Sequence, residues 1–148
     1  MRCRLLAVTA GVGLLLGAAA PVAAHHAFAA EFDGKQPVTL RGVVTKVEWT
    51  NPHIWIFLDV KGKDGKVAKW EVEGGAPNAL YRRGFNKNSL PAGAEVVMEG
   101  YRAKDGSNTI NGRSMVFTDG RTQFLGSSGT GAPEDGRDPT DSKQNRQK

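Results

Sequence analysis

Apolar and polar residues alternate along the middle of the chain with the two-residue period of β-strands. Over residues 53–60 one phase is aliphatic and the other is aromatic or polar: the first is Ile54, Ile56, Leu58 and Val60, and the second is His53, Trp55, Phe57 and Asp59. This alternation predicts a strand with one buried face. Asp64-Gly65 predicts a hairpin turn into a second strand over Val67–Glu73, with Trp70 and Val72 inward and Glu71 and Glu73 outward.

The stretch before these strands, 38–49, is rich in β-branched residues, but its alternation slips. Val38 and Leu40 share one phase, whereas Val43, Val47 and Trp49 share the other. The slip falls at a glycine, so we expect a β-bulge at Gly42 that bends a long first strand. Thr50-Asn51-Pro52 then predicts a turn.

The second half of the domain begins with a break at Gly74-Gly75. Residues 76–83 predict one or two helical turns, because Pro77 suits a first turn and Gly84 a helix end. Strands are predicted at about 95–102, at 113–118 and in a short stretch that ends at Leu125. The turn pairs Asp105-Gly106 and Asn111-Gly112 predict a long loop or short hairpin between the first two of these strands.

Three strands, a short helix and two or three further strands follow the element order of an OB-fold. We therefore predict an all-β protein: a small OB-fold-like Greek-key barrel of five to six strands, with the helix between strands three and four. A plain β-sandwich and an open meander are the alternatives. The span 25–125 is long enough for one such core and too short for two domains.

The two ends of the chain carry different signals. Residues 1–24 combine Arg2 and Arg4, an uncharged apolar stretch and a small-residue exit, which predicts a cleaved signal peptide and a periplasmic or secreted protein without stable membrane insertion after cleavage. Cleavage after Ala24 would leave His25 first, whereas a second site after Ala29 would discard two histidines. Residues 126–148 contain no aromatic residue and no Val, Ile, Leu or Met, which predicts a disordered tail.

Charge and cysteine content exclude several function classes. Loss of two leader arginines lowers the formal net charge from +5 to +3, and the charges are interspersed, so we expect no nucleic-acid partner. The only cysteine, Cys3, lies in the leader. No Gly-x-Ser-x-Gly elbow, His-Glu-x-x-His motif or thiol nucleophile occurs in the span after the leader, and the pair Glu71 and Glu73 is typical of a solvated strand face. We therefore expect a protein that is not an enzyme.

The three histidines of the chain are His25, His26 and His53. Imidazole binds copper, nickel and zinc, and an amino-terminal histidine adds its amine as a second nitrogen ligand. If His25 is the mature amino terminus and leads into the first strand, these residues predict a metal site, with copper as the candidate ion. The alternative is a mobile terminal stub together with a turn histidine that hydrogen-bonds to the backbone.

A second candidate site lies on the outer face of the two middle strands. Trp55 and Phe57 share this face with Lys69 and Glu71. An aromatic platform flanked by charge can stack a sugar, a peptide or an aromatic small molecule. The alternative is a second packed layer covered by the helix or by the amino-terminal segment. Trp49 and Trp70 continue inward alternations and are expected to be structural.

The chain also resembles a known family through several motifs. They are His25-His26-Ala27-Phe28, Phe32-Asp33, the segment 38–44, Trp49-Thr50-Asn51-Pro52-His53, Trp70-Glu71-Val72-Glu73, the segment 80–85 and Asp119-Gly120. Together they resemble domain of unknown function family 6152, which consists of secreted bacterial proteins without an assigned activity. Three residues, 29–31, separate the first two motifs and depart from the family pattern. The resemblance implies an exported single domain and supplies no catalytic residues.

These observations favour an exported, non-enzymatic binding module of unknown ligand, for which copper or another transition metal at His25, His26 and His53 is the candidate. The alternative is a structural or accessory envelope protein that binds a partner or small molecule through Trp55, Phe57, Lys69 and Glu71.

Overall fold

The computed structural model of the chain describes residues 26–126. The predicted signal peptide, His25 and all but one residue of the predicted tail lie outside the described residues. The elements follow one another as α2 (His26–Glu31), β1 (Phe32–Glu48), β2 (Trp55–Lys61), β3 (Val67–Glu73), α3 (Pro77–Arg82), β4 (Glu95–Ala103), β5 (Thr109–Phe117) and β6 (Thr122–Phe124). None of the helices in this described span is long and apolar enough to cross a membrane.

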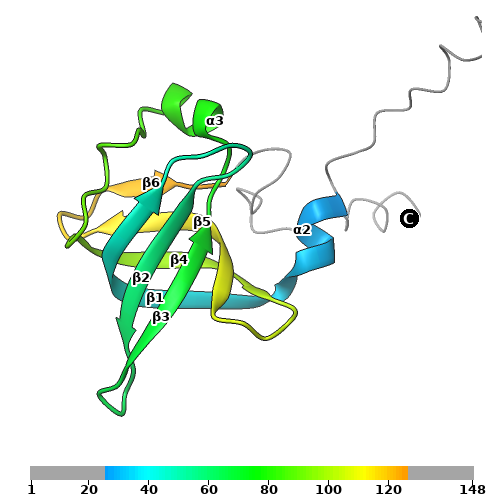
Figure 1. Cartoon of the computed structure of the whole chain (residues 1–148), viewed down its shortest axis with the longest axis vertical. Coiled ribbons are helices and arrows are strands. Elements are labelled where there is room, and N and C mark those ends of the chain that lie inside the picture. The colour runs from blue at the N-terminus through cyan, green and yellow to red at the C-terminus, as the bar shows by residue number, and fades with distance from the viewer. Residues whose placement is uncertain (1–25, 127–148) are drawn as a thin grey trace, which may run out of the picture.

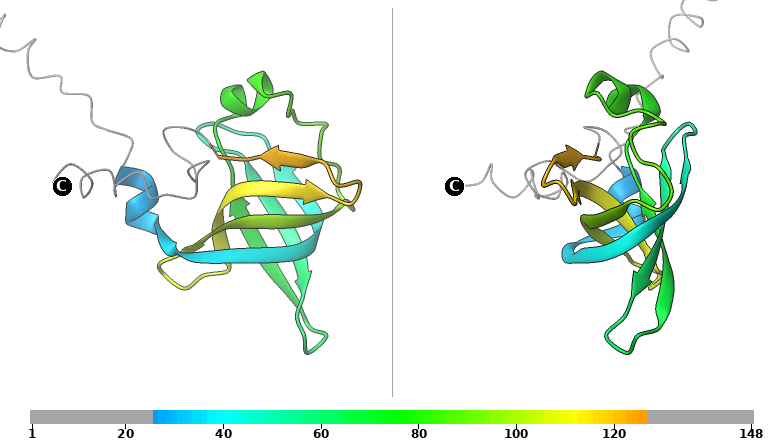
Figure 2. Two further views of the ribbon diagram at one scale, coloured as in Figure 1. Left: turned by 180° about the vertical axis from the view of Figure 1, so that it is seen from behind. Right: turned by 90° about the vertical axis from the view of Figure 1, so that its left-hand side faces the viewer.

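The strands form a closed ring. Their order is β3-β2-β1-β4-β5-β6, and β3 also pairs with β5 in parallel, which joins the two ends of a five-stranded sheet. In Figures 1 and 2, β2 and β3 cross β1, β4 and β5 steeply, and α3 lies at one end of the ring. This pairing, with a helix between β3 and β4, confirms the predicted all-β, OB-fold-like architecture.

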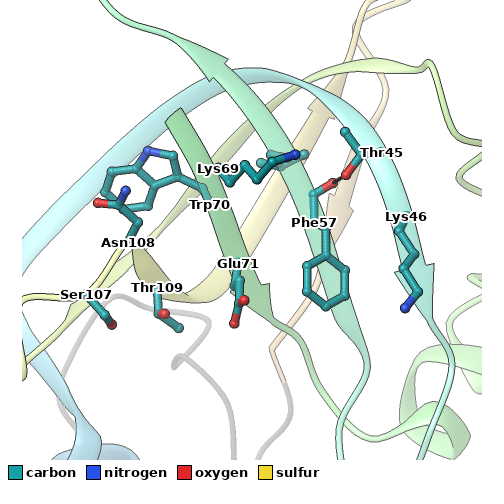
Figure 3. Close-up of a pocket in the computed structure, with 10 residues that line it drawn as sticks. Thr45, Lys46, Phe57, Lys69, Trp70, Glu71, Ser107, Asn108 and Thr109 are labelled. Atoms are coloured by element: carbon teal, nitrogen blue, oxygen red, sulfur yellow. Dashed lines mark hydrogen bonds between the residues drawn. The ribbon is translucent and has the colours of Figure 1, made fainter. Parts of the chain in front are cut away.

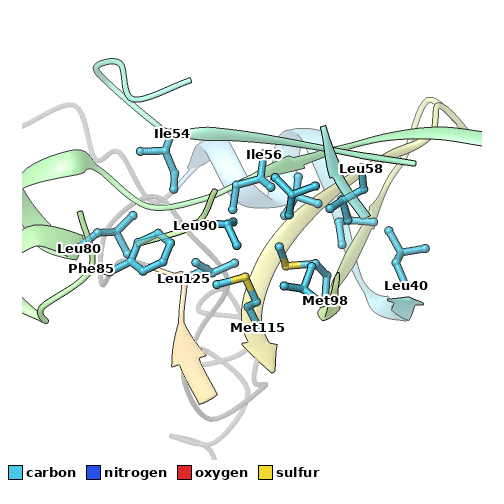
Figure 4. Packing of buried hydrophobic residues seen from close by; sticks show 14 residues of the cluster. Leu40, Ile54, Ile56, Leu58, Leu80, Phe85, Leu90, Met98, Met115 and Leu125 are labelled. Carbon is cyan, nitrogen blue, oxygen red and sulfur yellow. The ribbon is translucent and has the colours of Figure 1, made fainter. Parts of the chain in front are cut away.

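The core fills the ring from its inner face (Figure 4). Its fully buried side chains come from every strand of the ring, from the segment between β3 and β4, and from the residues just before β2 and just after β6: Val44, Ile54, Ile56, Leu58, Val72, Leu80, Met98, Ile110, Met115 and Leu125. Burying a side chain of this size contributes about 1.5–3 kcal/mol. The aliphatic phase of β2 is therefore the core face, as its alternation predicted.

The helix α3 begins where the sequence indicates. Pro77 occupies the first turn, and Gly84, at φ +82°, lies just after the helix end. Leu80 points into the core and Phe85 packs beside Trp49, with ring centroids 5.9 Å apart. Arg83 donates a hydrogen bond from Nη1 to the carbonyl of Gly126 (2.6 Å), which ties α3 to the chain that follows β6.

The bulge predicted at Gly42 was wrong. Gly42 pairs regularly with Val96, and the irregularities of β1 lie elsewhere, between Val44 and Lys46 against β2 and between Phe32 and Pro37 against β4. A Cβ on Gly42 would lie 2.8 Å from the carbonyl oxygen of Asp59, so the glycine permits close approach of β2. The inward phase therefore runs to Val44 before it changes.

One other local prediction was wrong, and one helix was not predicted. Asn111 and Gly112 lie inside β5 and do not form a turn. Gly112 serves packing there, since a Cβ at this position would lie 2.7 Å from Val72. His26–Glu31 forms the helix α2, which the sequence analysis did not predict. Phe28 of α2 is buried with Phe32 and Tyr101, at centroid distances of 5.9 and 5.6 Å.

Candidate functional site

A row of polar and aromatic residues crosses the outer face of the ring at the end of β3. Trp55 of β2 pairs with Glu73 of β3, and Glu73 pairs with Asn111 of β5. The neighbours Val72 and Ile110 point into the core, so Glu73 and Asn111 point to the other side of the sheet. Both are nevertheless buried, with exposed fractions of 6% and 0%. Glu73, predicted to lie on a solvated face, is therefore shielded from water.

His53 joins this row from the loop before β2. Backbone hydrogen bonds from Ile54 N to the Gly75 carbonyl (3.2 Å) and from Gly74 N to the Ile54 carbonyl (2.9 Å) extend the β2–β3 pairing to the residue beside it. The His53 ring contacts Glu73 Oε1 through Nδ1. Only 14% of the His53 side chain is exposed. The extended β2–β3 pairing thus positions the imidazole of His53 in contact with the buried carboxylate of Glu73.

Asn111 holds the other oxygen of the same carboxylate. Its Nδ2 donates a hydrogen bond of 3.2 Å to Glu73 Oε2. Burial raises the pKa of Glu73, because a desolvated carboxylate is costly in its charged form, and the charge of Glu31 at the end of α2 acts in the same direction. The charge of His53 and the hydrogen bonds from His53 and Asn111 oppose this increase in pKa.

Two atoms of this His53–Glu73–Asn111 cluster have no hydrogen-bond partner in the described part of the chain. They are His53 Nε2 and Asn111 Oδ1, and both are buried. The amide oxygen of Asn111 is an acceptor, whereas His53 Nε2 is an acceptor in the neutral tautomer with the proton on Nδ1 and a donor in the charged imidazolium. Leaving a buried polar atom unpaired costs about 1–3 kcal/mol. The cluster therefore contains two buried polar atoms without a hydrogen-bond partner among the described residues.

The three histidines have different positions relative to this cluster. His53 belongs to the cluster. His26 is the first residue of α2, and the structure describes its backbone but not its side chain. His25 lies outside the described residues. Across residues 26–126 no group of three or more His, Cys, Asp or Glu side chains is placed to hold a metal ion. The side chain that His53 contacts is Glu73, and the sequence analysis did not predict this contact.

The predicted aromatic face borders two adjoining cavities, of which Figure 3 shows the first. One, of about 540 Å³, is lined by Phe57, Lys69 and Glu71 together with the bulge of β1 and the loop before β5. The other, of about 500 Å³, is lined by Trp55 and by the end of α2. Ser107 and Thr109 line both. We call the pair the outer groove.

The four predicted residues of this face are therefore divided between two cavities. The Lys46 ammonium lies 5.4 Å from the centre of the Phe57 ring, and Lys69 lies 3.5 Å from Asp59. Trp55 and Phe57 are half-buried among the described residues. Lys46 and the loop 107–109 are groove residues that the alternation of β2 and β3 alone did not indicate.

Comparison with known proteins adds one family. The sequence profile of a family of unknown function (DUF6152) matches residues 12–112. The chain belongs to this family. No curated protein and no solved structure matches the chain. Membership in DUF6152 agrees with the resemblance carried by the histidine and Trp-Thr-Asn-Pro-His motifs, and it assigns no activity.

Proposed function

We propose that the protein is an exported, non-enzymatic binding module that handles copper(II) through His25, His26 and His53. One observation carries the proposal: His53 is buried with Nδ1 against Glu73, while its Nε2 has no partner among the described residues. Histidines that bind metals commonly donate the other ring N–H to a carboxylate, which fixes the ring and leaves one nitrogen for the ion.

The position of α2 supports a contribution from the amino terminus. Glu31 at the end of α2 lines the same cavity as Trp55, the cross-strand partner of Glu73, and its charge acts on Glu73. His26 begins α2 five residues earlier, about 7.5 Å along a helix axis. After cleavage behind Ala24, His25 would add an amine and an imidazole one residue before α2 in the sequence, and copper(II) accepts both.

The proposal is tested by copper(II) titration of the mature protein beginning at His25. We expect one ion per chain, with affinity that falls as pH falls through about 7 to 6, because protons compete for imidazole nitrogens. One alanine added before His25 should weaken binding roughly 100-fold, equivalent to about 2.8 kcal/mol. His53→Ala should also weaken binding and preserve the fold.

The matched control adds one alanine after Lys148 and should bind copper like the mature protein. Equal affinities for the native and the amino-terminally extended proteins would rule out the amine as a ligand. Unchanged binding by His53→Ala would rule out a site that bridges the two segments.

A second candidate function is that of an accessory envelope protein that binds a partner or small molecule in the outer groove. It is favoured by the two adjoining cavities of about 540 and 500 Å³ beside Phe57 and Trp55. Such rings stack on sugars and on aromatic groups, while Lys69 and Glu71 can orient a polar substituent.

This second candidate predicts a selective response of Trp55. In protein labelled with 5-fluorotryptophan, chitotriose or indole-3-acetate, titrated separately, should shift the ¹⁹F signal of Trp55 and leave that of Trp49, which packs against Phe85, in place. Trp55→Phe assigns the signal. If neither probe at millimolar concentration moves the Trp55 signal, the groove does not stack rings of these two kinds.

A further inference from the structure

The outer groove is elongated across the strands. Its two cavities, of about 540 and 500 Å³, meet at Ser107 and Thr109, which line both. Figure 3 shows that the first cavity crosses β1, β2 and β3 and reaches the loop before β5. Sites for compact small molecules bury most of the ligand in a single pocket. Two cavities in succession instead match a ligand that extends along the groove.

Each cavity contains one aromatic ring from β2. Phe57 lines the first cavity and Trp55 lines the second. The two residues are two positions apart in one strand, so their side chains leave the same face of the sheet about 7 Å apart along β2. In Figure 3 the Phe57 ring lies between the side chains of Lys46 and Glu71. The groove therefore offers two neighbouring rings on which successive rings of a chain-like ligand can stack.

The charges that line the groove are balanced. The ionisable lining residues are three lysines and three acids: Lys46, Lys69, Lys104, Glu31, Glu71 and Asp105. The ammonium of Lys46 lies 2.5 Å from Glu48, and that of Lys69 lies 3.5 Å from Asp59. Grooves that bind single-stranded nucleic acid combine stacking rings with an excess of positive charge. The lining of the outer groove has no such excess, which favours an uncharged ligand.

The uncharged polar lining consists of hydroxyl and amide groups. Thr45, Ser107 and Thr109 supply hydroxyls, and Asn108 supplies an amide. Hydroxyl and amide groups both donate and accept hydrogen bonds, so they match a ligand that is rich in hydroxyls. A pyranose combines such hydroxyls with an apolar C–H face that stacks on an aromatic ring, whereas an indole offers a single N–H donor.

We infer that the outer groove binds a neutral oligosaccharide, whose successive sugar rings stack on Phe57 and Trp55 and whose hydroxyls bond to Ser107, Asn108 and Thr109. This inference rests on the second candidate function and narrows its ligand to one chemical class. It is independent of the copper proposal, because His53 lines neither cavity.

Calorimetric titration of the mature protein with chitobiose and with chitohexaose tests the inference. The hexasaccharide should bind at least about tenfold more tightly, because only the longer chain reaches both rings. Its affinity should change less than about twofold between about 50 and 500 mM sodium chloride, since no ion pair with the ligand is screened. Equal affinities for the two sugars would contradict a ligand that spans both cavities.

Trp55→Ala and Phe57→Ala should each weaken chitohexaose binding about tenfold, because each removes one stacking ring. Tyr81→Ala is the matched control. It removes a ring that is 70% exposed on α3 and lines neither cavity, so it should bind like the wild type. Circular dichroism checks folding. If an alanine variant does not fold, the ¹⁹F signal of 5-fluorotryptophan at Trp55 decides: a shift on addition of chitohexaose supports the inference, and no shift overturns it.

Two further probes separate the possible failures. If chitohexaose does not bind and indole-3-acetate shifts the Trp55 signal, the inference is wrong and the second candidate function stands. If neither binds, the second candidate function loses its small-molecule ligand together with the inference. A heparin hexasaccharide that binds more tightly than chitohexaose, with affinity lost at high salt, would identify a site for polyanions and overturn the inference.

Discussion

Gly100→Ala is expected to destabilise the protein by about 3 kcal/mol or more, the upper range for added volume in a packed interior. A Cβ at this position would lie 2.2 Å from the carbonyl oxygen of Asn111 and 3.0 Å from its carbonyl carbon. Both obstacles are backbone atoms of the paired strand β5, so no side-chain rotation relieves the overlap. The pairing of β4 with β5 shifts register at this point, between Glu99 and Gly100.

Urea unfolding of the wild type and of Gly100→Ala measures this loss of stability. Gly65→Ala is the control, because Gly65 has open space around it but a φ of +80° in the β2–β3 hairpin. The free energy of unfolding of this control should decrease by only about 1–2 kcal/mol, because of backbone strain. A loss for Gly100→Ala no larger than that of Gly65→Ala would contradict the close approach of β4 and β5. Because the overlap is with Asn111, the same variant should also disturb the His53–Glu73–Asn111 cluster.

The parts of the fold that follow from strict local patterns could be predicted from the sequence. The bounds of β3 were predicted because alternation is regular and Asp64-Gly65 sets the turn, where Gly65 has positive φ. The short helix followed from Pro77 and Gly84. Gly42 was misread because alternation locates a change of face only to within a few residues. A glycine needed for close approach looks the same in sequence as a glycine at a bulge.

The candidate site depends on pairings that local patterns do not contain. Glu71 and Glu73 share one phase of β3, and nothing in that phase says that one is exposed and the other buried. Their difference arises because Glu73 reaches both His53 and Asn111, which lie 20 and 38 residues away. Asn111 itself was assigned to a turn, since Asn-Gly has the same turn propensity wherever it occurs. The parallel pairing of β3 with β5 overrides that propensity.

The amino-terminal helix was missed for a related reason. Six residues are too few to show a helical period, and short isolated helices are unstable in water. What stabilises α2 is tertiary contact, because Phe28 is 3% exposed and packs on Phe32 and Tyr101. The segment His26–Glu31 is therefore held to the barrel through Phe28.

Phe28→Ala is accordingly expected to lower the free energy of unfolding by about 3 kcal/mol, the lower end of the range for a buried phenylalanine. The loss comes from the contacts with Phe32 and Tyr101, which lie outside the main core. Chemical denaturation measures this decrease in the free energy of unfolding. Phe57→Ala, which removes a half-buried ring of the outer groove, should decrease it clearly less. A protein that begins at Ala30 should be at least as unstable as Phe28→Ala, since it lacks the same ring.

Phe28→Ala and the protein that begins at Ala30 also distinguish two contributions to copper binding: the packing of α2 on the barrel and the presence of the amino-terminal histidines. Phe28→Ala retains His25, His26 and His53 but loosens the attachment of α2, so its copper affinity should fall about tenfold or more, because ordering the segment then costs free energy on binding. The protein that begins at Ala30 should lose the site altogether. If Phe28→Ala matches the wild type in both unfolding and copper affinity, α2 is not a packed element of the mature domain. The proposed copper site shared between the two segments would then lose its support.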